Sequence, residues 1–167
     1  MEITDLCEEW TMEKRYFPLF IDISEKKIVV IGGGKIAERR VEALLSFRGN
    51  VTVISPEITE TLEKFVREDK IVWIQECYQE EMISGADFVL AATNDAACNE
   101  QVVADCHTRG ILVNASHKKE VCDFYFPGTV TDGEIVVGIS SSGENHAKVK
   151  RVREAIENLL ENLDENR

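Results

Sequence analysis

The sequence predicts an α/β fold with a doubly wound parallel sheet, and three observations support this prediction. Short apolar runs alternate with segments of helical periodicity over residues 28–113, as they do in successive βαβ units. Three consecutive glycines, residues 32–34, separate the first apolar run from the first helical segment. Residues 87–92 hold a continuous apolar segment, which is typical of a strand buried on both faces of a parallel sheet.

The stretch of residues 27–40, KIVVIGGGKIAERR, has the order of strand, tight turn and helix N-terminus at which dinucleotides bind. We expect Gly32 to form the turn and Gly34 to let the backbone approach a pyrophosphate with no Cβ between them. Ala37 takes the third small position, where the helix packs on the sheet. The amides of the first helical turn would then face the phosphates. The alternative is a glycine-rich turn that binds no ligand.

The other elements of the sheet follow in chain order. The first helix is expected to end at Gly49 and Asn50, because these residue types tolerate left-handed backbone. Residues 16–23, YFPLFIDI, are interpreted as an edge strand or an extended lead-in. Further strands are expected at residues 51–54, 71–74, 87–92 and 111–113, and helices at residues 59–68, 79–84 and 95–109.

The pattern changes at Asn114. Two extended runs, residues 124–131 and 134–140, are joined at Asp132 and Gly133, which predicts a hairpin. A last helix carries apolar residues at spacings of three and four, namely Val149, Val152, Ile156, Leu159 and Leu163. This seam packs on its own hairpin or faces a second copy, and the small hairpin favours a homodimer. We therefore expect a nucleotide-binding domain at residues 16–113 and a dimerisation and substrate region at residues 114–167.

Charge and composition exclude several classes of protein. The chain has 167 residues and 44% hydrophobic residues, enough for a full α/β core. Its 19 basic and 31 acidic residues give a net charge of −12, which disfavours nucleic acid and anionic membranes as partners. No apolar run approaches the length of a membrane span, and the acidic N-terminus does not resemble a signal peptide. We expect a cytoplasmic protein whose partner is a small molecule or another protein.

The cysteines are odd in number and form no CxxC pair, which is typical of reduced thiols. They are Cys7, Cys77, Cys98, Cys106 and Cys122. Cys98 and Cys106 share a helix face with Val102, so we expect small buried side chains there and no metal site.

Polar residues follow two of the predicted strands at the edge where open α/β sheets bind ligands. Ser55, Pro56 and Glu57 come after the strand at residues 51–54, where dinucleotide folds place an acid on the ribose. Thr93 and Asn94 follow the strand at residues 87–92. The next residue, Asp95, is expected to cap a helix rather than to act in catalysis.

Several segments together resemble the precorrin-2 dehydrogenase module of siroheme synthase. They are YFPLFIDI, IVVIGGGKIAERR, VTVISPE at residues 51–57, AATND at residues 91–95, CDFYFP at residues 122–127 and VVGISSSG at residues 136–143. The resemblance covers roughly residues 16–155. It implies a Rossmann domain, a homodimer, and oxidation of precorrin-2 to sirohydrochlorin with NAD, in some members alongside sirohydrochlorin ferrochelatase activity.

The resemblance also implies roles for individual residues. NAD would contact Gly32, Gly34, Lys35 and Ile36 at the pyrophosphate, Ser55, Pro56 and Glu57 at the adenosine, and Thr93 and Asn94 at the nicotinamide. The tetrapyrrole would lie against residues 114–127 and the turn at residues 140–143, with Asn114, Lys118 and Ser141 as contacts. Local cations and donors suit a substrate with many carboxylates, namely His117, Lys118, Lys119, Lys148, Lys150 and Arg151. The alternative interpretation of this cluster is a solvated helix face.

The chain departs from the family pattern in three ways. The family usually has Asn-x-x-Asp after the fifth strand, whereas this chain has histidine in place of the aspartate, at His117. Imidazole can accept a proton at neutral pH, so His117 is the catalytic candidate. The family's proline after the serine-glycine turn is His146 here. The sequence ends at Arg167, so we expect most of the family's C-terminal helical region to be absent.

Four hypotheses remain open from the sequence. The preferred one is an NAD-dependent precorrin-2 dehydrogenase. The alternatives are a nucleotide-sensing regulatory module, a sirohydrochlorin metal chelatase that uses His117 and His146, and a scaffold without catalysis.

Overall fold

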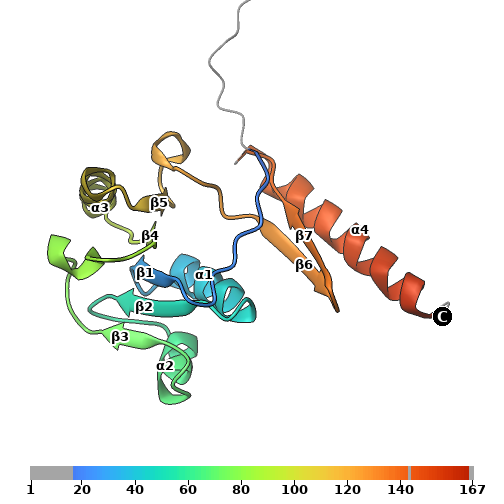
Figure 1. Ribbon diagram of the computed structural model, residues 1–167, viewed down its shortest axis with the longest axis horizontal. Coiled ribbons are helices and arrows are strands. Elements are labelled where there is room, and N and C mark those ends of the chain that lie inside the picture. Colours follow the sequence, from blue (N-terminus) through green and yellow to red (C-terminus); the bar gives the residue numbers. More distant parts are fainter. Residues whose placement is uncertain (1–16, 143, 166–167) are drawn as a thin grey trace, which may run out of the picture.

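A computed structural model describes residues 17–142 and 144–165, so the expectations for Cys7, Tyr16 and Gly143 lie outside the described residues. A five-stranded sheet with flanking helices forms one part of the molecule, and a hairpin with a long helix forms the other (Figure 1). In chain order the elements are β1 (Lys27–Ile31), α1 (Lys35–Ser46), β2 (Asn50–Ile54), α2 (Glu60–Arg67), β3 (Val72–Ile74), the 3₁₀ helix η1 (Glu80–Ile83), β4 (Phe88–Ala91), α3 (Ala96–Arg109), β5 (Leu112–Ala115), the 3₁₀ helix η2 (Lys119–Val121), β6 (Gly128–Asp132), β7 (Ile135–Ile139) and α4 (His146–Glu165).

The sheet has the order β3-β2-β1-β4-β5, and all neighbouring strands are parallel. The chain proceeds outward from β1 to β3 and then crosses back to place β4 on the other side of β1. The direction of winding therefore reverses between β1 and β4, and open α/β sheets bind ligands at the carboxyl ends of such a strand pair.

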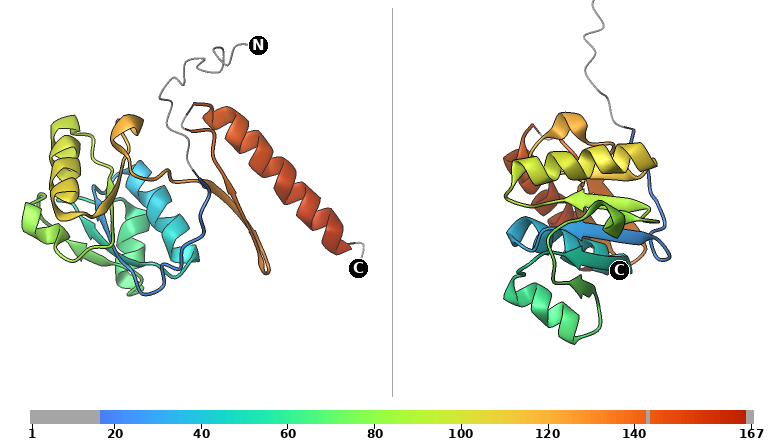
Figure 2. Two further views of the ribbon diagram at one scale, coloured as in Figure 1. Left: turned by 45° about the horizontal axis from the view of Figure 1, so that its top comes forward. Right: turned by 90° about the vertical axis from the view of Figure 1, so that its left-hand side faces the viewer.

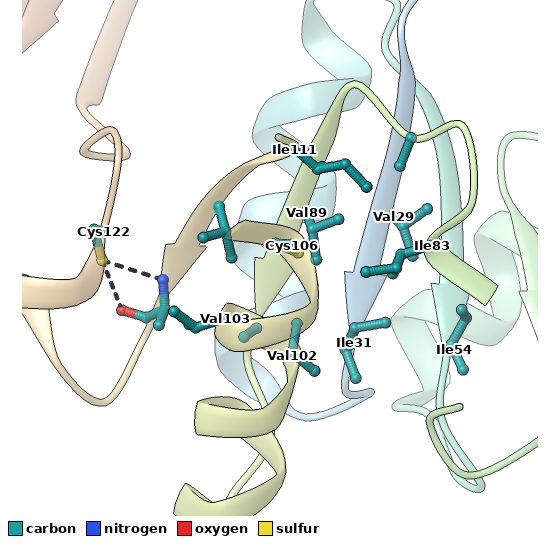
Figure 3. Packing of buried hydrophobic residues seen from close by; sticks show 14 residues of the cluster. Val29, Ile31, Ile54, Ile83, Val89, Val102, Val103, Cys106, Ile111 and Cys122 are labelled. Carbon is teal, nitrogen blue, oxygen red and sulfur yellow. Dashed lines mark hydrogen bonds between the residues drawn. The ribbon is translucent and has the colours of Figure 1, made fainter. Parts of the chain in front are cut away.

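Helices cover both faces of this sheet, which confirms the doubly wound α/β prediction. Side chains of β1 alternate between the faces. Val29 and Ile31 belong to a cluster that includes Val102 of α3 and Ile83 of η1 (Figure 3). On the opposite face, the residues that form the second cluster are Ile28, Val30, Ala37, Val41, Val51, Val53, Leu62, Ile71, Leu90 and Ala92. The sheet that carries the glycine turn is thus supported by an apolar cluster on each of its faces.

The end of α1 differs from the prediction. The left-handed residue after this helix is Arg48, with a φ of 58°, and not Gly49 or Asn50. Asn50 already begins β2. A Cβ on Gly49 would lie 3.1 Å from the Leu44 carbonyl oxygen and 3.1 Å from Ile28 Cδ1. Gly49 therefore provides space for close packing rather than a left-handed backbone.

Three other elements differ in detail from the prediction. The lead-in forms no strand at residues 17–23 and exposes Phe17, Leu19 and Phe20, so the edge-strand interpretation is wrong there. The third predicted helix is only the four-residue η1. The fifth strand runs to Ala115, so Asn114 is a strand residue and not a loop residue.

The hairpin is confirmed, with its turn shifted by one residue. Asp132 pairs with Ile135, so the two turn residues are Gly133 and Glu134. Gly133 has a φ of 53°, and glycine at the first central position is typical of two-residue hairpin turns.

The hairpin and α4 pack on each other beside the sheet (Figure 2). Val149 and Ile156 are partly buried, whereas Val152, Leu159 and Leu163 are 38%, 57% and 59% exposed. Only part of the predicted apolar seam is therefore covered by the hairpin. The exposed residues Val152, Leu159 and Leu163 have no apolar partner within the described residues. None of the described helices has the length and apolarity that a membrane crossing requires.

No cysteine among the described residues forms a disulfide bond. Cys106 is buried, as expected, and its burial raises the pKa of its thiol to about 12. Cys98 is half-buried and Cys77 is exposed.

Candidate functional site

The three glycines of the turn after β1 have three different surroundings. Gly32 has a φ of 114°, and a Cβ there would lie 2.6 Å from the Ala92 carbonyl oxygen. A Cβ on Gly33 would overlap the carbonyl oxygen of Glu57. A Cβ on Gly34 would meet no protein atom within 4 Å. The turn is thus packed against both neighbouring loops, while its last glycine faces open space, as close approach of a ligand requires.

The N-terminus of α1 has no side-chain cap. Its N-cap residue is Gly34, and within the described residues no side-chain cap hydrogen bond reaches the first turn. In α2 the hydroxyl of Thr59 accepts from the Leu62 amide, and in α3 the carboxylate of Asp95 accepts from the Ala97 and Cys98 amides. The expectation that Asp95 is an N-cap is confirmed. The amides and positive dipole end of α1 are thus open to an anionic group.

The loop after β2 lies against the glycine turn. The amide of Thr59 donates to the Gly33 carbonyl over 3.1 Å, and the Gly32 amide donates to the Ile54 carbonyl over 2.9 Å. Within this loop Ser55 is buried, whereas Pro56 and Glu57 are exposed. The three residues predicted to contact the adenosine, Ser55, Pro56 and Glu57, therefore lie in a loop beside the glycine turn.

Lys35 and Ile36 begin α1 and are exposed. The Lys35 ammonium lies 3.0 Å from the buried carboxylate of Glu38. Hydrogen bonds from Thr59 and from Lys35 hold the pKa of Glu38 below its ordinary value. Lys35 therefore has a carboxylate partner within its own helix.

The loop after β4 is fixed by Asn99, a fully buried residue of α3 that sequence reasoning missed. Asn99 Oδ1 accepts from the Thr93 amide over 3.1 Å, and Asn99 Nδ2 donates to the Thr93 carbonyl over 3.0 Å. Asn94 is exposed beside it. A polar residue on the apolar face of a predicted helix was the only signal in the sequence.

A cleft of about 320 Å³ lies between α1, the segment after β5, and the hairpin with α4. The residues that line it are Arg40, Asn114, Ala115, Ser116, His117, Lys118, Lys119, Cys122, Tyr125, Phe126, Gly128, Ile139, Ser140, Ser141, His146 and Val149. The four residues predicted to meet substrate or perform catalysis, Asn114, His117, Lys118 and Ser141, are among them. The amide of Ser116 donates to the Ala91 carbonyl over 2.9 Å, so this wall of the cleft is joined to the end of β4.

The lining of this cleft is basic and polar. It contains one arginine, two lysines and two histidines and no acidic residue, although the whole chain has a net charge of −12. Lys148, Lys150 and Arg151 do not line it, and Lys150 pairs with Glu154 at 3.7 Å on the helix surface. The predicted cationic cluster is thus divided into a cleft-lining part and a solvated part.

The segment after β5 is fixed to the sheet by several hydrogen bonds. The Cys122 thiol lies 3.2 Å from the Ala115 amide and 3.3 Å from its carbonyl oxygen (Figure 3). The Asp123 carboxylate accepts from the Val113 amide over 2.9 Å. Asn114 Nδ2 donates to the Phe124 carbonyl over 2.7 Å, and Asn114 Oδ1 is buried with no partner in the part of the chain that the structure describes. The wall that carries His117 is therefore held against β5.

The described residues contain no group of three or more histidine, cysteine, aspartate or glutamate side chains arranged to hold a metal ion. His117 and His146 do line the same cleft, as the sequence suggested.

A family model with the description "Putative NAD(P)-binding" matches residues 19–128, more than half of the chain. The chain belongs to this NAD(P)-binding family. The glycine turn and the uncapped α1 fit such a cofactor, because both offer backbone amides where a pyrophosphate would lie. NAD(P) when bound supplies the hydride chemistry, and the residues at the turn would hold and orient it.

Curated relatives of this NAD(P)-binding protein include "Probable multifunctional siroheme biosynthesis protein HemA" of Ruminiclostridium josui. It is 38% identical over 149 residues, which cover 89% of this chain and 29% of that protein. "Siroheme synthase" of Psychrobacter sp. (strain PRwf-1) is 33% identical over 144 residues, 86% of this chain and 30% of that protein. The chain therefore spans less than a third of the length of these relatives.

Among solved structures, "SirC, precorrin-2 dehydrogenase" has a TM-score of 0.72 and 24% sequence identity. The match covers 86% of this chain and 70% of that one. It extends past the sheet, so the hairpin and helix are part of the shared fold.

Proposed function

We propose that this chain is a cytoplasmic NAD-dependent enzyme that oxidises precorrin-2 to sirohydrochlorin in siroheme biosynthesis. The observation that carries the proposal is the basic cleft whose wall is joined to the carboxyl end of β4, at the sheet edge where the dinucleotide would bind. A cleft without acidic lining, on a protein with a net charge of −12, suits a substrate with many carboxylates. The names of the siroheme-synthesis relatives and of SirC support the same substrate.

The reaction removes two hydrogens from the substrate, one as a hydride to the nicotinamide and one as a proton. Gly32, Gly34, Lys35 and Ile36 would position the pyrophosphate, while Thr93 and Asn94 would orient the nicotinamide. His117 would accept the proton. Asn114, Lys118 and Ser141 would hold the tetrapyrrole against the opening of the cleft. The chain thus supplies orientation and one base, and the cofactor supplies the redox chemistry.

We further propose NAD rather than NADP as the cofactor. The loop that would meet the adenosine ribose, residues 55–59, carries the exposed carboxylate of Glu57 and no lysine or arginine. A carboxylate favours the ribose hydroxyl and repels the 2′-phosphate of NADP.

Purified protein mixed with precorrin-2 and NAD is expected to form NADH and the absorption spectrum of sirohydrochlorin together. The same mixture with NADP is expected to react at least about tenfold more slowly, because of the charge repulsion at Glu57. Both products are measured in one absorbance scan. The absence of both signals from protein that binds NADH would refute the proposal and leave the nucleotide-sensing and scaffold alternatives.

His117→Ala is expected to lower kcat about tenfold, less than is usual for loss of a general base, because the cofactor carries the main chemistry. His117→Asp restores the carboxylate of the family pattern and is expected to keep most of the rate. The affinity for NADH, measured by fluorescence titration, should stay within twofold in both variants. The control is Glu100→Ala on α3, which is exposed and does not line the cleft, and an equal loss of kcat there would remove His117 from the mechanism.

Metal insertion into sirohydrochlorin is the second candidate, because His117 and His146 line the same cleft. The same purified protein would then take up Fe²⁺ or Co²⁺ only with sirohydrochlorin present, and His117→Ala would lose that uptake.

We also propose that residues 114–167 form a homodimer interface and that residues 16–113 form the nucleotide-binding domain. The exposed apolar residues of α4, Val152, Leu159 and Leu163, follow one another along one helix face. Such a face on a small hairpin unit is covered in a stable protein, and a second copy of the chain presents a complementary one.

Leu159→Glu is expected to convert a dimer into a monomer, because it places a charge at the centre of this apolar face. Light scattering after size-exclusion chromatography gives the mass of each species. Asn158→Glu adds the same charge at the adjacent exposed position and should leave the dimer intact. A wild-type monomer, or a Leu159→Glu dimer, would contradict the proposed interface.

A further inference from the structure

Two buried side-chain atoms in the described residues have no hydrogen-bond partner, and both belong to residues that line the basic cleft. They are Nη1 of Arg40, a donor, and Oδ1 of Asn114, an acceptor. Buried polar groups are paired in most native proteins, so each such exception needs a reason. An unpaired donor and an unpaired acceptor in the same cleft indicate that a polar ligand completes the hydrogen bonds of this site.

Arg40 lies in the second turn of α1, and its guanidinium approaches the aromatic ring of Phe126, with 5.7 Å between Cζ and the ring centroid. No carboxylate within the described residues forms an ion pair with it. Burial lowers the pKa of Arg40 to about 10, so the group is charged at neutral pH. A partly buried cation without an anionic partner is costly to a fold unless a ligand supplies that partner.

The other cations of the cleft are placed differently. Lys119 is already paired with Glu144, at 2.8 Å, and Lys118 is exposed to solvent. Water screens charges at exposed positions, whereas a partly buried guanidinium binds a carboxylate through short, directed hydrogen bonds. Arginine is also the residue whose planar fork fits a carboxylate with two bonds and stacks on an aromatic ring.

We propose that Arg40 is the receptor for one carboxylate of the ligand that occupies this cleft, held in place by α1 and by the ring of Phe126. The inference rests on the proposed function for the identity of that ligand, a tetrapyrrole with carboxylate side chains. Because α1 also begins at the glycine turn, one helix would fix both the cofactor and the substrate. This role cannot be predicted from the sequence alone, since Arg39 and Arg40 are adjacent residues of the same type.

The test compares Arg40→Met with Arg39→Met. Arg39 is the neighbouring arginine, exposed and outside the cleft, so it controls for the loss of one positive charge. Binding is measured for sirohydrochlorin by absorbance titration and for citrate, a polycarboxylate without pyrrole rings, by calorimetry. We expect Arg40→Met to weaken binding of both probes by about 10- to 100-fold, Arg40→Lys to give an intermediate loss, and Arg39→Met to stay within about threefold.

Two further measurements separate a binding role from a structural one. The affinity for NADH should be unchanged in Arg40→Met, and its thermal unfolding midpoint should not fall, because the variant removes an unpaired buried charge. A lower midpoint with unchanged sirohydrochlorin binding would make Arg40 structural and overturn the inference while leaving the proposed function intact. Citrate binding that depends on Arg40, with no sirohydrochlorin binding by the wild type, would support the carboxylate receptor and refute the proposed substrate. A wild type that binds neither probe would overturn both.

Discussion

Gly33→Ala is expected to lower the free energy of unfolding by about 3 kcal/mol, because the new Cβ would overlap the Glu57 carbonyl oxygen and crowd Ile58. The loop after β2 would have to move, and the amides at the start of α1 would move with it. We therefore expect the affinity for NADH to fall more than tenfold. Urea denaturation and fluorescence titration measure the two effects.

Gly34→Ala is the matched variant one residue away. Its Cβ would meet no protein atom within 4 Å, and its φ of −83° suits alanine, so stability should change by less than about 1 kcal/mol. The Cβ would instead lie where a pyrophosphate approaches, so NADH affinity should still fall. Equal stability of the two variants would contradict the packing argument, and unchanged affinity in Gly34→Ala would contradict the ligand argument.

Asn99→Leu is expected to lower the free energy of unfolding by about 2 to 3 kcal/mol. Leucine has a similar volume but leaves the Thr93 amide and carbonyl without their partners. The loop after β4 would lose its support, so hydrogen exchange at the Thr93 amide should accelerate and NADH affinity should fall. Denaturant titration and exchange measured by NMR record these changes.

The control for this variant is Glu100→Ala, on the next position of α3, where the side chain is exposed. It should change stability by less than about 0.5 kcal/mol. Slow exchange at the Thr93 amide in Asn99→Leu would show that other contacts hold the loop.

The sheet could be predicted because its signals are local. The alternation of apolar runs and helical periodicity predicted every strand of the sheet, and each predicted strand end lies within two residues of the observed one. Asp95 could be recognised as a helix cap from the residues that follow it. The end of α1 could not be predicted in this way. Arg48 adopts the left-handed conformation, while Gly49 is needed for its distance to Ile28 and Leu44, and those distances exist only in the folded chain.

In the candidate site, too, some residues could be predicted from local sequence and others only from the folded chain. Gly32, Gly34, Thr93 and His117 could be proposed as site residues from the sequence, because each lies in a segment that follows a predicted strand. Gly33, Asn99 and Arg40 could not, since their importance comes from the loop, carbonyl or ring that each one meets across the fold. The basic lining of the cleft likewise combines residues from α1, the segment after β5 and the start of α4.

The absence of a side-chain cap on α1 links the supply of cofactor to the survival of the folded chain. Thr59 and Asp95 complete α2 and α3 from within the protein, whereas the pyrophosphate would complete α1 from outside. A ligand that binds only the native state stabilises it by about 2.7 kcal/mol when present at 100 times its Kd. In a domain of ordinary marginal stability this is a large fraction of the total. Dinucleotide scarcity would therefore shorten the lifetime of this protein against proteolysis before it limited any rate of turnover.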